Sequence, residues 1–197
     1  GLTIIDSVDH RCAGGYLYQL GILDVVQDIA KVMNRDLKNW GVKKMVVTLD
    51  AIHHILNEVH PKEMGVTYEQ EVIDLNEYIL EKIKASEIQL PEAPLNLTVT
   101  VHDNCFSKAN NGRYWEAPRE ILKKCGCEII EMKHHKRDSL CCGWGAGASW
   151  TSNFSLMPQI LSEGLKKFKE ARATGAKAIV CYCEGCNFVL WILREML

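Results

Sequence analysis

Hydrophobic and polar residues follow two different periods along this chain. Four short runs rich in β-branched residues predict buried strands, at 43–50, 95–103, 127–132 and 176–183. Between these runs, apolar residues recur at the spacing of amphipathic helices, at 16–39, 69–86, 116–125 and 158–173. Alternating strand and helix signals are typical of parallel α/β units, so the pattern predicts an α/β fold.

The order of motifs repeats on the two sides of a proline-containing linker, residues 85–96. "RCAGG" precedes a long helix, a strand and "TLDAIH" in the first half, and "CCGWG" precedes a long helix, a strand and "CYCEGC" in the second. We therefore predict two related Rossmann-like halves with parallel sheets, 1–86 and 87–197, of which the first is a degenerate copy. Superposing the halves pairs Cys12 with Cys142, Asp50 with Cys183 and His53 with Cys186.

Composition narrows the classes of partner. The 197 residues are 47% hydrophobic and 24% charged, with a formal net charge of −2 and no basic stripe, which argues against nucleic acid. The longest apolar runs are far shorter than a membrane span, so we expect a soluble, cytoplasmic chain without a transmembrane segment, able to dock on a membrane complex. The opening at Gly1 is typical of a fold interior, and we expect a fragment or a processed chain.

The cysteines are concentrated in one region. Eight of the nine lie at or after position 105, whereas a disulfide framework would spread them along the chain. An odd number of cysteines favours a reducing compartment, in which thiolates bind metal, and we expect no signal peptide. The sequence therefore predicts a local metal site.

Five of these cysteines follow predicted strands. Cys105 ends the motif "HDNC", Cys141 and Cys142 open the glycine-rich "SLCCGWGAG", and Cys183 and Cys186 form the C-x-x-C pair of "CEGC". Loops after parallel strands meet at one edge of the sheet, where α/β folds bind their ligands. Adjacent cysteines usually point apart, so both members of the pair reach one centre only if that centre is larger than a single ion. A multi-iron cluster meets this requirement better than tetrahedral zinc.

Other residues near these motifs have weaker candidate roles. Gly143 and Gly145 are expected to let the backbone approach a cluster and to donate N–H groups to its sulfurs. His102 is a candidate proton donor to a leaving thiolate.

Two further expectations concern residues outside the five-cysteine set. A zinc site at Cys12, Asp50 and His53 is a lesser alternative. Cys125, Cys127 and Cys181 are expected to pack in the core, and Cys181 to point away from Cys183.

The motifs "HDNC", "EAPREIL", "SLCCGWGAG" and "CEGC" resemble the cysteine-rich CCG domain of heterodisulfide reductase subunits B and D. Related domains occur in iron-sulfur subunits of glycolate and lactate dehydrogenases and in a sulfite-reduction complex. The resemblance covers 95–191 in detail. It implies a [4Fe–4S] cluster, cubane or non-cubane, that reduces a disulfide. Its implied ligands are Cys105, Cys141, Cys142, Cys183 and Cys186.

Three functions stay open at this point. The first is reduction of a small disulfide or a sulfur-carrier protein, with electrons from an iron-sulfur or flavin subunit; the fifth cysteine favours it, because a cubane cluster uses four. The second is electron relay from a flavin dehydrogenase to a quinone or carrier. The third is a structural module that holds zinc.

Overall fold

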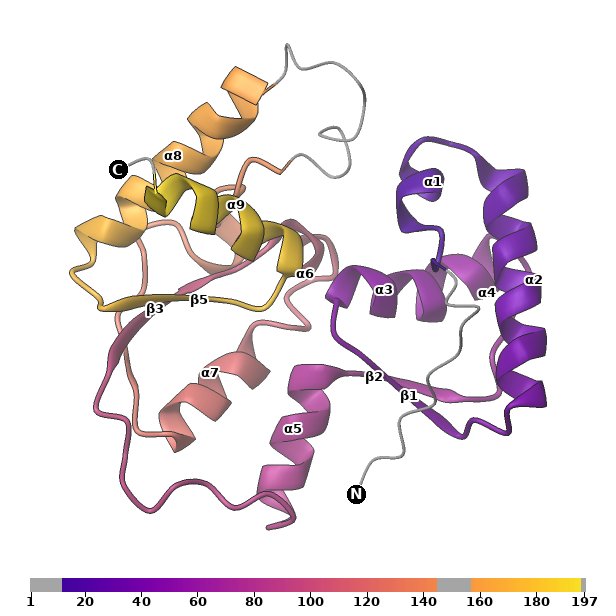
Figure 1. The fold of residues 1–197 in the computed structure, drawn as a ribbon, viewed down its shortest axis with the longest axis horizontal. Coiled ribbons are helices and arrows are strands. Elements are labelled where there is room, and N and C mark those ends of the chain that lie inside the picture. The colour runs from indigo at the N-terminus through magenta and orange to yellow at the C-terminus, as the bar shows by residue number, and fades with distance from the viewer. Residues whose placement is uncertain (1–11, 145–156, 196–197) are drawn as a thin grey trace. The chain divides into compact units, whose positions relative to one another are not determined.

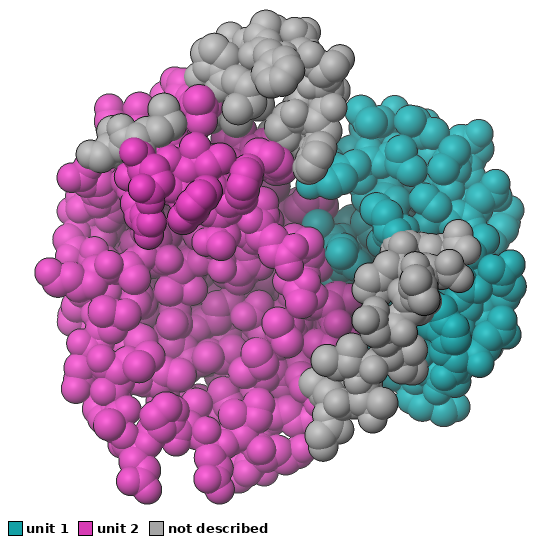
Figure 2. Space-filling model, viewed as in Figure 1, with its two compact units in different colours: residues 1–45, 51–72 teal, residues 46–50, 73–197 magenta. Residues whose placement is uncertain are grey.

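Helices and strands alternate along the chain as the hydrophobic pattern predicts (Figure 1). The structure is a computed structural model that describes residues 12–144 and 157–195. Within it the chain forms two compact units, coloured separately in Figure 2. Residues 1–45 and 51–72 form the first unit, and residues 46–50 and 73–197 form the second.

The first half of the chain is mainly helical. In chain order its elements are α1 (Gly15–Gln19), α2 (Leu23–Asn39), β1 (Lys44–Val47), α3 (Asp50–His54), a π-helical turn (Ile55–Val59), α4 (His60–Lys62) and β2 (Glu71–Asp74). Strands β1 and β2 form a small parallel sheet.

The second half alternates helices with the strands of a second sheet. Its elements are α5 (Leu75–Lys84), β3 (Thr98–His102), α6 (Cys105–Ala109), α7 (Glu116–Lys124), β4 (Glu128–Ile129), a 3-10 turn (Lys136–Asp138), α8 (Met157–Ala173), β5 (Ala178–Cys181) and α9 (Glu184–Glu195).

Strand β3 is the centre of this second sheet, whose order is β4-β3-β5. Both neighbours run parallel to it, with Val99 opposite Ala178 and His102 opposite Cys181. The predicted α/β class with parallel strands is therefore confirmed, and the carboxyl ends of β3 and β5 lie at the same edge.

Helices cover both faces of the β4-β3-β5 sheet (Figure 1). On one face, Phe168 of α8 and Leu193 of α9 belong to a buried cluster against which Ile179 of β5 packs. On the other face, Val101 and Tyr182 form a cluster against which Leu122 of α7 packs. Burying apolar side chains on both faces supplies most of the stability of such a three-layer unit.

Two expected helices differ from the observed elements. The helix predicted at 16–39 is broken between α1 and α2, where Gly21 adopts a φ of 75°, a conformation that glycine tolerates and other residues rarely adopt. The helix predicted at 69–86 begins as strand β2. Asp74 then caps α5 by accepting hydrogen bonds from the backbone N–H groups of Asn76 and Glu77, at 2.8 and 3.3 Å.

The observed units do not coincide with the halves predicted at 1–86 and 87–197, because α5 belongs to the second unit. The division into compact units does not test whether the two halves of the chain are related. The two related Rossmann-like halves therefore stay a prediction. No helix within the described ranges has the length and apolar character that a membrane span requires.

Candidate metal centre

Three segments bring cysteines to the carboxyl edge of the β4-β3-β5 sheet. Cys105 is the first residue of α6, three residues after the end of β3. Cys183 follows β5, and Cys186 lies in the first turn of α9. The third segment is the loop of Cys141 and Cys142, which precedes α8. All five predicted cysteines therefore belong to the second unit.

Three potential metal donors of this group lie close together. A ring nitrogen of His102 and the Sγ atoms of Cys142 and Cys186 all lie within 4.8 Å of one another, and all three residues are buried. His102 is only 1% exposed, and neither of its ring nitrogens makes a hydrogen bond of ordinary geometry within the described residues. The ring nevertheless interacts with the Cys142 sulfur, and this interaction contributes to lowering the pKa of Cys142.

Cys142 is the electrostatic centre of the group. Hydrogen bonds from the thiols of Cys141 and then Cys186 hold the pKa of Cys142 well below its usual range. The same contacts with Cys142 raise the pKa of Cys141 and of Cys186. Cys142 is thus the preferred thiolate, with a thiol on each side.

The remaining two cysteines extend the group. A hydrogen bond with the thiol of Cys186 lowers the pKa of Cys183. Exclusion of water by the surrounding protein raises the pKa of Cys105 to about 11, and the nearby sulfurs of Cys142 and Cys183 add to this effect. Each of the five sulfurs therefore interacts with at least one of the others.

The donor set fits a sulfur-ligated metal cluster. Five cysteine sulfurs and one imidazole nitrogen gather at one sheet edge, and thiolates are the ligands of iron–sulfur clusters. Anionic sulfurs this close repel one another, which favours keeping the protons of the Cys141 and Cys186 thiols that donate to Cys142. A bound cation would replace those protons.

Asp50 adds a carboxylate near the cysteines. It is 1% exposed, and its charge contributes to raising the pKa of both Cys105 and Cys183. The superposition of the two halves pairs Asp50 with Cys183, but it does not indicate that the two side chains lie near each other. Asp50 is a residue whose position in the site the sequence did not predict.

A buried ion pair involves the residue that follows His102. Asp103, between His102 and Cys105 in sequence, accepts hydrogen bonds from Arg119 Nη1 and Nη2 at 2.7 and 2.8 Å. Arg119 also donates to both carboxylate oxygens of Glu131, at 2.7 and 2.9 Å. The Arg119 side chain is 3% exposed and that of Asp103 is 0% exposed, so each charge depends on its partner.

Asp103 also joins the three cysteine-bearing segments. Its backbone carbonyl accepts a hydrogen bond from Ser139 Oγ at 2.7 Å, two residues before Cys141. Its carboxylate accepts one from Tyr182 OH at 3.0 Å, immediately before Cys183. One buried residue therefore fixes the ends of the loops that carry Cys105, the cysteine pair and the C-x-x-C motif.

Gly164 is a second residue that sequence reasoning missed. A Cβ at this position of α8 would lie 2.5 Å from the carbonyl oxygen of Cys142 and 2.7 Å from Leu193 Cδ1. Only glycine lets the helix approach the cysteine pair so closely. A glycine within a helical pattern was the available signal, because glycine is unfavourable there without a packing reason.

The other candidate residues have mixed outcomes. Gly143 has a φ of 92° and donates its N–H to Cys141 Sγ at 3.3 Å, and the expected hydrogen bond to a cluster sulfur stays a prediction. Gly145 lies outside the described residues. Cys127 is buried, as expected.

The expectation that Cys181 points away from Cys183 assumed that both residues lie on one strand, but β5 ends at Cys181, so the alternation of a strand does not extend to Cys183. Cys181 packs against the α8–α9 cluster, as its core role requires. Burial raises its pKa to about 12, with contributions from Cys142 and Cys183.

The alternative zinc site stays a prediction. In the first unit, Cys12 is exposed and its Sγ accepts a hydrogen bond from the N–H of Gly14 at 3.4 Å. His53 Nε2 lies 3.1 Å from Asn57 Nδ2. Asp50 belongs to the second unit.

The fold and the site together define an α/β domain with a cysteine-rich centre at the carboxyl edge of a parallel sheet. Residues 99–191 match the cysteine-rich CCG domain family, and this part of the chain belongs to it. The match includes all five cysteines of the candidate centre.

Curated relatives extend the similarity beyond the matched domain. The chain is 31% identical over 187 residues to EtfAB:quinone oxidoreductase of Syntrophomonas wolfei, covering 91% of this chain and 25% of that protein. It is 28% identical over 184 residues to the D subunit of the dihydromethanophenazine:CoB–CoM heterodisulfide reductase of Methanosarcina barkeri, covering 91% and 43%. It is 32% identical over 180 residues to the probable iron-sulfur-binding oxidoreductase FadF of Bacillus subtilis, covering 90% and 24%.

The chain thus spans 24% to 43% of the length of these relatives. It is a distant relative of iron–sulfur oxidoreductases and of their subunits.

Proposed function

We propose that this chain is an iron–sulfur oxidoreductase subunit that reduces a disulfide or a related sulfur substrate. The observation that carries the proposal is the mutual interaction of five cysteine sulfurs at one sheet edge, centred on Cys142. A cubane [4Fe–4S] cluster needs four cysteines, so a fifth supports a centre with additional chemistry.

Cys105, Cys141, Cys142, Cys183 and Cys186 are the proposed ligands of a [4Fe–4S] cluster. Such a cluster supplies electrons one at a time and stabilises a sulfur anion that would otherwise be a poor leaving group. The overall reaction is RSSR + 2e⁻ + 2H⁺ → 2 RSH, in which the S–S bond breaks and each sulfur takes up one electron and one proton.

The protein's own residues supply position and proton transfer. Asp103 and Arg119 hold the three cysteine-bearing loops, as described above. His102, buried beside Cys142 and Cys186, is the proposed proton donor to the leaving thiolate. We propose that the electrons come from an iron–sulfur or flavin subunit, in line with the relatives that are named as subunits of larger reductases.

Electron relay without sulfur chemistry is the second candidate. The name of the relative from Syntrophomonas wolfei, EtfAB:quinone oxidoreductase, supports it, because that name pairs EtfAB with a quinone and no disulfide. The same five-cysteine centre would serve as an intermediate carrier in this case.

Adding a disulfide to the reduced protein separates the two candidates. Under disulfide reduction, we expect the visible and paramagnetic-resonance spectra of the reduced centre to change on addition of a dialkyl disulfide. Two thiols should form for every two electrons lost, measured with a thiol reagent under anaerobic conditions. An unchanged spectrum and no thiol, with a centre that still exchanges electrons with dithionite, would contradict disulfide reduction and support relay.

A further inference from the structure

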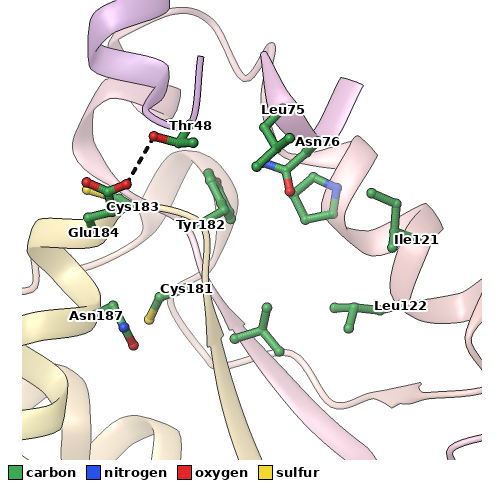
Figure 3. Close-up of a pocket in the computed structure, with 12 residues that line it drawn as sticks. Thr48, Leu75, Asn76, Ile121, Leu122, Cys181, Tyr182, Cys183, Glu184 and Asn187 are labelled. Carbon is green, nitrogen blue, oxygen red and sulfur yellow. Dashed lines mark hydrogen bonds between the residues drawn. The ribbon is translucent and has the colours of Figure 1, made fainter. Parts of the chain in front are cut away.

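A cavity of about 380 Å³ opens beside Cys183 (Figure 3). It lies wholly within the second unit, between helices α5 and α7 and the end of β5. Its volume is that of a small-molecule site rather than of a packing defect. The residues that line it include the proposed cluster ligand Cys183 and Cys181, the last residue of β5.

The body of the cavity is apolar. In Figure 3, Leu75 of α5 and Ile121 and Leu122 of α7 lie on the side opposite Cys181 and Cys183. Pro118 and Val180 complete the apolar lining. These side chains would surround an alkyl or other apolar group and remove it from water, which stabilises binding.

The polar side of the cavity carries a single charge. Among the described residues that line it, Glu184 is the one acidic residue, and no lysine, arginine or histidine contributes. Thr48 Oγ1 donates a hydrogen bond to Glu184 Oε1 at 3.0 Å, shown as the dashed line in Figure 3. Asn76 and Asn187 add neutral amides. An anionic group here would meet a like charge and no cation, which is unfavourable.

Residues 133–137, with the basic sequence KHHKR, do not offset the charge of Glu184. Lys136 Nζ forms an ion pair with Glu116 at 2.6 Å, and His134 Nδ1 lies 2.7 Å from Glu170 Oε1. None of the five residues of this run lines the cavity.

We propose that the cavity binds an apolar, uncharged or cationic arm of the substrate, and that its position beside Cys183 directs that arm's sulfur toward the cysteine centre. The inference rests on the proposed function for the identity of the ligand as a sulfur substrate. It adds the chemical class of the substrate: an alkyl disulfide with a neutral or cationic arm binds, and a carboxylate-bearing disulfide is rejected.

Thioether probes test the cavity without thiol exchange, because they keep the arms of a disulfide and lack its S–S bond. Dibutyl sulfide is the apolar probe. The diamide and the dicarboxylate of thiodipropionic acid form a second pair of probes, which have the same shape and differ in charge. Binding to the full chain is measured by titration calorimetry. Ile121→Trp fills the cavity, and Ile88→Trp makes the same change at a residue that is 38% exposed and lies outside it.

We expect dibutyl sulfide to bind the natural chain and the Ile88→Trp variant with affinities within about twofold, and to bind Ile121→Trp at least about tenfold more weakly. We expect the diamide to bind at least about tenfold more tightly than the dicarboxylate, and Glu184→Gln to narrow that ratio. Equal loss in both tryptophan variants, or equal binding of diamide and dicarboxylate, would overturn the proposal. The Glu184→Gln comparison stands even if Ile121→Trp fails to fold.

The readouts separate this inference from the proposed function. If the chain binds these probes as expected but contains no iron, the cavity is supported as a binding site and disulfide reduction is contradicted. If the chain contains iron and reduces disulfides but binds the diamide and the dicarboxylate equally, the proposed function is supported and the assignment of the cavity is contradicted.

Discussion

Replacing Arg119 with methionine is expected to lower the free energy of unfolding by about 3–5 kcal/mol, because it leaves the Asp103 carboxylate buried without its cation. The Arg119 side chain is 3% exposed and binds both Asp103 and Glu131 with paired hydrogen bonds. The loss should appear in urea unfolding followed by circular dichroism.

The chain offers a matched control for this experiment. Arg113 makes the same two-bond contact with the carboxylate of Glu77, at 3.1 Å for both bonds, but its side chain is 50% exposed. Arg113→Met should therefore lower the free energy of unfolding by only about 0–1 kcal/mol. Equal losses in Arg119→Met and Arg113→Met would show that burial of the Asp103–Arg119 pair has no special role.

The same pair has a defined dependence on pH. Burial opposes ionisation of Asp103, but hydrogen bonds from Arg119 and the Lys136 backbone outweigh it and lower the pKa of this carboxyl below its ordinary value of 3.8. A lowered folded-state pKa contributes stability that is complete above the unfolded value and is lost as the pH falls through the folded value. The contribution of Asp103 to the free energy of unfolding of the natural chain should therefore be constant above about pH 4 and be lost as the pH falls below that value, which urea unfolding at a series of pH values measures.

The second large effect is expected at Cys142. Cys142→Ser removes the sulfur that interacts with both Cys141 and Cys186, so we expect iron content to fall from about four atoms per chain to below about one. Cys127→Ser is the matched control, because Cys127 is also buried and is not a proposed ligand. Iron retained in Cys142→Ser, or lost equally in Cys127→Ser, would contradict the role of Cys142.

The parts of the structure that could be predicted are those that local pattern determines. The β-branched run around Val99 and Val101 became the central strand, and alternation of strands with helices was enough for parallel pairing. The proximity of Cys105 to Cys142 and Cys183 followed from the same reasoning, because loops after parallel strands share one edge.

The parts that could not be predicted depend on contacts between distant residues. Arg119 occupies an amphipathic helix, where an arginine is normally exposed, and nothing near it in sequence indicates that Asp103 is its partner. The broken helix at Gly21 and the strand before Asp74 show the same limit, because tertiary packing overrides helical periodicity in short segments. The apolar cavity is also a product of packing, since α5 and α7 line it from positions far apart in the chain.

The central claim is that the five cysteines hold an iron–sulfur cluster. Its most direct test is the iron and zinc content of protein purified without oxygen, together with a paramagnetic-resonance spectrum after reduction. The account predicts about four irons per chain, little zinc and a cluster signal. One zinc per chain, no iron and no signal would contradict it and leave a structural metal module in its place.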